Sequence, residues 1–77
     1  MRGWIIVFDA LEFGSVPVSE QELKEYPCKF RLLDGDGEVY YYGISKEVSF
    51  APLDEFGKPF AGCTSIEYFN EEVWIEL

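Results

Sequence analysis

The chain has 77 residues, which is near the lower limit for unaided folding and leaves room for a single domain, residues 1–77, around one core. Apolar residues make up 48% of it and aromatic residues 18%, a composition that argues against a disordered chain. Fifteen acidic against six basic side chains, with no His, give a formal net charge of −9, which disfavours nucleic acid and anionic lipid as partners and favours a basic one.

The N-terminus and the cysteines bear on the compartment. The opening stretch, MRGWIIVFDALE, carries one basic residue and an apolar run too short for an export signal or a membrane span. We therefore expect a cytoplasmic protein with no membrane partner, in which Cys28 and Cys63 are thiols. A Cys28–Cys63 bridge stays open, because the sequence does not show the distance between the two side chains.

The first predicted element is a strand. Residues 3–9, GWIIVFD, form a continuous β-branched and aromatic run that is apolar on both faces. This pattern predicts a strand at the centre of a sheet, or one covered on both sides. Gly14 and Pro17 then mark an irregular connection.

Residues 19–27, SEQELKEYP, predict one short helix. Ser19 is a suitable N-cap, and Glu22 stands at the position that completes a capping box. Pro27 ends the helix, because the residue before a proline avoids helical backbone angles.

The stretch RLLDGDGEVYYYG, residues 31–43, begins like a calcium-binding loop. An EF-hand loop starting at Asp34 would need Gly at its sixth position and a carboxylate at its twelfth, where this chain has Val39 and Ser45. Asp-Gly is instead typical of a tight hairpin turn. We therefore expect two antiparallel strands. Residues 47–50, EVSF, either extend the second strand beyond a kink at Gly43 or form a short strand of their own.

A hairpin loop of two or four residues around Gly35 predicts how these strands pair. Leu32 would lie opposite Val39, and Phe30 opposite Tyr41, all on the core face. The other face would interleave cations with tyrosines, a surface on which bases or sugars stack, although ordinary cross-strand pairs give the same pattern. The residues of this candidate face are Lys29, Arg31, Tyr40 and Tyr42.

Residues 45–64 contain two prolines and two glycines, and predict a long loop with at most one helical turn. Phe56 and Phe60 in this segment either plug the core or form an apolar contact patch. We expect plugging, because a chain this small needs its aromatic residues inside.

The C-terminal residues 64–77, TSIEYFNEEVWIEL, predict a second hairpin that turns near Asn70. Trp74 would lie among carboxylates, which suits an interface anchor or a cover for the back of the sheet. The last strand would be an edge, and an unprotected edge invites pairing with another chain, including a second copy of this one. The candidate partner-binding residues are Trp74, Glu67, Glu72 and Glu76.

Catalytic signals are weak. The absence of His removes Ser-His-Asp and Cys-His arrangements. Asp54, Glu55 and Cys63 are the remaining candidates for acid–base or thiol chemistry, but no motif supports them, and Cys63 beside small residues is typical of a packed thiol. Two distant cysteines without His do not make a zinc site. We therefore expect no enzyme, no metal and no cofactor.

These features predict a small, mainly β fold: a curved antiparallel sheet, or a partly closed barrel, of about five strands with one short helix after the first strand. The favoured function is a non-enzymatic binding or accessory module that contacts a basic or amphipathic protein through Trp74 and the neighbouring glutamates. The alternative is single-stranded nucleic acid or sugar binding on the face that carries Lys29, Arg31, Tyr40 and Tyr42.

Overall fold

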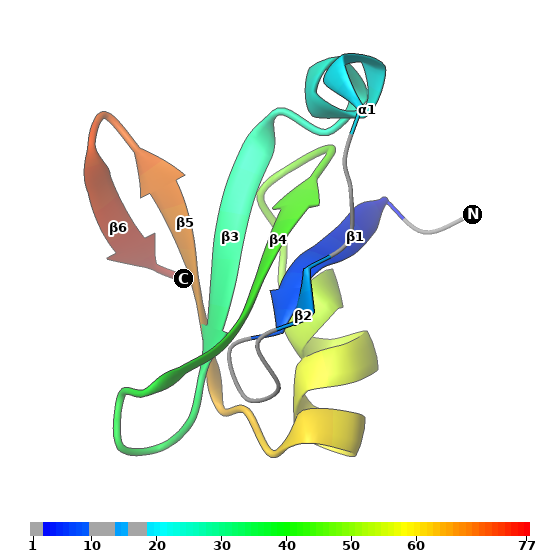
Figure 1. The fold of residues 1–77 in the computed structure, drawn as a ribbon. Helices are drawn as coiled ribbons and strands as arrows, with labels where there is room; N and C mark the ends of the chain where they lie inside the picture. Colours follow the sequence, from blue (N-terminus) through cyan, green and yellow to red (C-terminus); the bar gives the residue numbers. More distant parts are fainter. Residues whose placement is uncertain (1–2, 10–13, 16–18) are drawn as a thin grey trace.

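The computed structural model describes residues 3–9, 14–15 and 19–77, and shows one antiparallel sheet with two helical segments (Figure 1). The strands are β1 (Trp4–Asp9), β2 (Gly14–Ser15), β3 (Cys28–Leu33), β4 (Val39–Ser45), β5 (Ser65–Asn70) and β6 (Val73–Glu76), and the helices are α1 (Glu20–Glu25) and η1 (Leu53–Ala61). Neither helix in this described part is long and apolar enough to cross a membrane.

The strand order is β2-β1-β4-β3-β5-β6, and every neighbouring pair is antiparallel. Because β2 has only two residues, five longer strands make up the sheet, which confirms the mainly β prediction. The sheet is open and does not close into a barrel. The predicted connection around Pro17 lies outside the described residues.

The short helix after the first strands is confirmed as α1. The Ser19 hydroxyl accepts a hydrogen bond from the Glu22 N–H at 3.2 Å, and the Glu22 carboxylate accepts one from the Ser19 N–H at 3.3 Å. This reciprocal pair is the predicted capping box. The helix ends at Glu25, ahead of Pro27.

The core lies between one face of the sheet and helix η1, which is the yellow helix behind β1 and β2 in Figure 1. We call this the inner face of the sheet and the opposite side the outer face. Alternation along each strand sends every second side chain inward. The buried cluster consists of Trp4, Phe30, Leu32, Leu53, Cys63, Ile66 and Tyr68.

Residues 4–9 form strand β1, but it is not central, because β1 has β4 on one side and the two-residue β2 on the other. The central pair is β3 and β4. Strand β4 is continuous through Gly43 and ends at Ser45, so the kink is wrong, and residues 47–50 neither extend the strand nor form one of their own. Gly43 lies opposite Phe30, whose fully buried ring fills the space where a side chain at residue 43 would be.

The hairpin between β3 and β4 differs from the prediction in its loop. The Asp34 N–H donates to the Glu38 carbonyl at 3.0 Å, which leaves a three-residue loop, and Gly37 has a left-handed φ of 85°. A loop with an odd number of residues would exchange the inward and outward side chains of β4. An extra residue at Tyr40, a β-bulge, restores them. The outcome is a shift of two residues relative to the predicted register, with Leu32 opposite Tyr41.

The predicted loop at residues 45–64 contains helix η1, a helix with wide π-type turns. Sequence reasoning missed it because Gly57 and Pro59 disfavour an ordinary helix. A wide turn accommodates Pro59, whose ring clashes with the carbonyl four residues earlier in an α-helix. Gly57 lets the helix sit close to the core, since a Cβ there would lie 3.2 Å from the Cβ of Cys63.

The turn between β5 and β6 consists of Glu71 and Glu72, with φ values of 51° and 70°. Two positive φ values in a two-residue turn define the type I′ turn that Asn-Gly favours. Here two glutamates occupy it, although left-handed backbone costs a non-glycine residue about 1–2 kcal/mol.

Gly43→Ala should destabilise the fold by about 2 kcal/mol, because the added methyl group collides with the Phe30 ring and the Ile5 carbonyl. Urea unfolding followed by circular dichroism measures the effect. Gly35→Ala is the matched control, since nothing lies within 4 Å of a Cβ there, and it should change stability by less than about 0.5 kcal/mol. Equal stability of the two variants would contradict the close approach of Phe30 to the backbone.

Replacing Glu71 by Asn together with Glu72 by Gly should raise the free energy of unfolding by about 1 kcal/mol, because both new residues accept left-handed backbone more readily. Glu71→Gln with Glu72→Gln removes the same two charges without relieving the backbone. A gain in the Gln pair equal to that in the Asn-Gly pair would assign the effect to charge.

Candidate interaction surface on the outer face

The outer face carries four aromatic rings from four different strands. Ring centroids are 6.0 Å apart for Phe8 and Tyr42, 6.2 Å for Tyr42 and Trp74, and 5.1 Å for Trp74 and Phe69. All four side chains are at least partly exposed. We call Phe8, Tyr42, Trp74 and Phe69 the ring row. Helix η1 packs on the inner face, so it does not cover the ring row.

The Arg31 side chain lies under Trp74 and is held by Glu67. These two residues are cross-strand neighbours on β3 and β5, and the Glu67 carboxylate accepts a hydrogen bond from Arg31 Nε at 2.6 Å. The guanidinium lies 4.3 Å from the centre of the Trp74 ring. Trp74 therefore reaches from β6 across the ion pair to Tyr42, and cation–π contacts of this kind contribute roughly 0.5–2 kcal/mol.

The two sites that the sequence suggested separately are one surface. Arg31 and Tyr42, from the basic and aromatic set, contact Trp74 and Glu67, from the acidic set. Lys29 lies at the margin, 6.0 Å from the Phe69 ring. A mutation in either set thus disturbs the other.

Tyr40 does not belong to this surface. It is the bulge residue of β4, it packs against the core cluster, and its hydroxyl hydrogen-bonds to the Asp34 carboxylate, which raises the pKa of Tyr40. The Asp34 carboxylate also accepts hydrogen bonds from the Glu38 and Asp36 N–H groups at 2.9 Å. The Glu38 bond is the main cause of a lowered pKa for Asp34. Asp34 is therefore a turn residue, and the prediction that Tyr40 lies on the same face as Arg31 is wrong.

The remaining acidic candidates form a rim along the β6 edge of the outer face, from the β5–β6 turn to the far end of the strand. Glu76 lies opposite Glu67 on the edge strand, and Glu72 lies in the turn beside Glu71. Glu72 is exposed and precedes β6, so it does not lie on the outer face of a strand beside Trp74, as predicted. It lies in the turn next to that face. The carboxylates of Glu71, Glu72 and Glu76, none of which pairs with a cation among the described residues, thus flank the ring row.

A hollow of about 230 Å³ opens on the outer face between α1 and the ring row. Apart from Lys29 its walls are apolar. Leu23 of α1 is exposed at one side of it, and Tyr42 and Trp74 stand at the other. Its volume lies below the roughly 300–1,000 Å³ of ordinary small-molecule sites, and suits one large apolar side chain.

Sequence reasoning missed two members of the ring row. Phe69 follows Glu67 by two residues on β5, so strand alternation alone places it on the same face. Strand alternation does not predict the face of Phe8, because a β-bulge at Val7 turns this side chain outward, where it contacts Tyr42.

The two loop phenylalanines have different fates. Phe56 packs against the core and lies 5.0 Å from the Tyr41 ring, which agrees with the expected plugging role. Phe60 is 78% exposed, so plugging is wrong for this residue. Phe56 lies against the rings of Trp4 and Tyr41 on the sheet, whereas Phe60 lies against Phe56, with 6.4 Å between the ring centroids.

The residues considered for catalysis do not converge. Cys63 is 1% exposed, and burial, helped by the charge of Asp34, raises the pKa of its thiol to about 11. Asp54 pairs with Lys58 at 3.4 Å on the surface of η1. Both cysteines are free, and within the described residues no group of three or more His, Cys, Asp or Glu side chains is placed to hold a metal ion.

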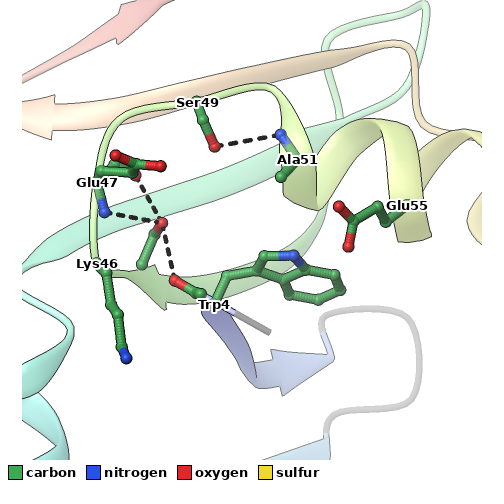
Figure 2. Close-up of a pocket in the computed structure, with 8 residues that line it drawn as sticks. Trp4, Lys46, Glu47, Ser49, Ala51 and Glu55 are labelled. Carbon is green, nitrogen blue, oxygen red and sulfur yellow. Dashed lines mark hydrogen bonds between the residues drawn. The ribbon is translucent and has the colours of Figure 1, made fainter. Parts of the chain in front are cut away.

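Glu55 lines a wider hollow of about 780 Å³ at the end of the inner face, where its carboxylate points toward the Trp4 indole (Figure 2). The other polar groups here serve the chain itself. Ser45 Oγ donates to the Glu47 carbonyl at 2.6 Å, and Ser49 Oγ accepts from the Ala51 N–H at 3.3 Å. This hollow is shaped by the turn that joins β4 to η1.

The thiols should react unequally. A disulfide-exchange reagent such as Ellman's reagent should modify the partly exposed Cys28 of the native protein, whereas Cys63 should react only after unfolding, because its thiol is buried and stays protonated at mildly alkaline pH. Absorbance of the released thiolate measures both. The Cys28→Ser protein should lose the fast reaction and Cys63→Ser should keep it; a fast reaction in Cys28→Ser would contradict the burial of Cys63.

Comparison with protein family models, with curated proteins and with solved structures finds no match for this chain. Its function is therefore inferred from the outer face alone.

Proposed function

We propose that this chain is a protein-binding module whose outer face takes a basic, amphipathic segment of a partner protein. The observation that carries the proposal is the ring row, which forms a continuous, partly exposed aromatic surface around an ion pair that is already internally neutral. Tyr, Trp and Phe at the centre of a patch, with charges at its margin, are typical of protein interfaces.

The charges support a basic partner over a nucleic acid. A groove for single strands needs a track of free cations along the phosphates. On the described outer face Arg31 is bound to Glu67, which leaves Lys29 as the remaining cation of that set. The rim glutamates and the net charge of −9 repel phosphate and attract Lys or Arg side chains.

The hollow beside the ring row supports an amphipathic partner. One large apolar side chain fits between Leu23, Tyr42 and Trp74. Cations next to it in the partner would then reach the carboxylates of Glu72 and Glu76. An apolar anchor surrounded by charges that steer the approach combines the two contributions that interfaces generally use.

We propose further that the module is not an enzyme and that it works in a reducing, cytoplasmic compartment. The protonated, buried Cys63 and the pairing of Asp54 with Lys58 support the first proposal, and the two free cysteines support the second.

The ring row also fits the alternative function, the binding of single-stranded nucleic acid or sugar, because bases and sugars stack on such rings. Point mutations do not separate the two functions, because Arg31, Tyr42 and Trp74 are in mutual contact. The test therefore compares two ligands, a peptide and an oligonucleotide. The two tryptophans report different places: Trp4 is 4% exposed in the core, and Trp74 lies in the ring row.

Protein labelled with 5-fluorotryptophan should show a fluorine NMR shift of Trp74, and none of Trp4, when a short peptide with one Phe between lysines is added. Short oligothymidine should leave both signals unchanged. Tyr42→Ala should weaken peptide binding about tenfold because it removes a wall of the hollow, whereas Tyr40→Phe, the matched control, should not. A Trp74 shift with oligothymidine and none with the peptide would replace the proposal with the alternative.

A further inference from the structure

The open edge of strand β6 is the feature that the ring row does not use. Within the described residues β6 pairs only with β5, through a register that sets Phe69 opposite Trp74 and Asn70 opposite Val73. The Leu77 N–H donates to the Ile66 carbonyl at 3.2 Å, so Leu77 points its backbone toward β5. Backbone direction alternates along an antiparallel strand, so Trp74 and Glu76 point their N–H and C=O groups outward. No strand among the described residues meets them there.

An apolar groove runs along the inner side of the same edge. Its volume is about 410 Å³. Ile75 and Leu77 of the C-terminal segment form one wall, and Val48, from the turn after β4, forms part of the other. All three side chains are more than 40% exposed, because η1 covers the part of the inner face next to β1 and β4 and leaves this end open.

The edge has only part of the protection that natural sheets place on such strands. Edge strands are usually very short, or carry charged side chains (above all lysine), proline or a bulge, each of which discourages another strand. β6 is four residues long and carries Glu76, but it has no lysine, proline or bulge. Residues 60–77 contain no Lys, Arg or Pro, and carry four glutamates. Three of these, Glu71, Glu72 and Glu76, pair with no cation in the part of the chain that the structure describes, whereas Glu67 holds Arg31. The edge is therefore protected against acidic strands only.

We infer that β6 binds an extended segment of a partner protein as an added strand, and that this segment alternates Lys or Arg with aliphatic residues. The inference deepens the proposed function and rests on it. The alternation follows from the two sides of the edge. Side chains on the outer side meet Glu76 and the rim, and those on the inner side meet Ile75 and the groove.

A second copy of the chain is the wrong occupant on electrostatic grounds. Antiparallel pairing of two β6 strands would bring Glu71, Glu72 and Glu76 of both copies to one short edge, where no Lys or Arg of the C-terminal hairpin offsets them. Like charges on paired strands are destabilising. A basic strand turns the same carboxylates into attractive contacts.

The test uses a synthetic peptide of alternating Lys and Val, acetylated and amidated at its ends, and two versions of it that are N-methylated on one or the other set of alternate amides. A strand added to an edge bonds through only one of its two sets of amides. We expect one methylated peptide to bind about tenfold more weakly than the parent and the other to bind nearly as well. The backbone amides of Trp74 and Glu76 should exchange more slowly with solvent in the complex, by NMR.

Protein variants give an independent reading. Glu76→Pro removes an outward N–H that β5 does not use, and edge strands tolerate proline at such positions. Glu76→Gln removes the same carboxylate and keeps the N–H. We expect Glu76→Pro to bind the parent peptide about tenfold more weakly than Glu76→Gln does.

The outcomes separate this inference from the proposed function. If the peptide shifts the Trp74 fluorine signal but both methylated peptides bind alike and the two amides exchange as before, edge pairing is overturned and outer-face binding stands. If the peptide affects neither the ring row nor the edge, both fail. If Trp74 and Glu76 amides become protected with rising protein concentration and no peptide, the occupant is a second copy and the inference is wrong.

Discussion

The packing of the Phe30 ring on the bare backbone of Gly43 is the contact on which the sheet depends. β3 and β4 are its central strands, and a fully buried ring opposite a glycine fixes how they align. β1 pairs with the other side of β4 and β5 with the other side of β3, so their alignments build on the same contact. The outer face inherits its order from this inner one: Tyr42 comes to lie beside Arg31, and Arg31 beside Glu67.

Local signals carried much of the fold. The capping box of Ser19 and Glu22 located α1, and the apolar runs located the strands, because each depends on residues close in sequence. The misses involve positions where a neighbour far along the chain decides. Gly43 resembles a kink until Phe30 is placed over it, and Gly57 resembles a loop residue until the helix is packed on Cys63.

Part of the candidate surface was predictable from the sequence, but Phe8 and Phe69 were missed, and so was the fact that the residues form one surface. Trp74, Glu67, Arg31 and Tyr42 were all identified from strand patterns, yet they were divided between two sites. What joins them is the pairing of β3 with β5, two strands separated by more than thirty residues of chain. Hairpin reasoning does not reach that far, since it pairs only strands that follow one another. Tyr40 was misplaced for a different reason, because a bulge does not show in an alternating pattern.

Two irregularities in the β3–β4 hairpin compensate for each other. The three-residue loop at Gly35–Gly37 would exchange the inner and outer faces of β4, and the extra residue at Tyr40 restores them. A deletion of one loop residue alone would therefore send Tyr42 into the core and Tyr41 into solvent. The same deletion accompanied by loss of Tyr40 would leave both faces intact. A change in the length of the loop is thus tolerated only together with a change at the bulge. A relative whose loop is one residue shorter should also lack the bulge.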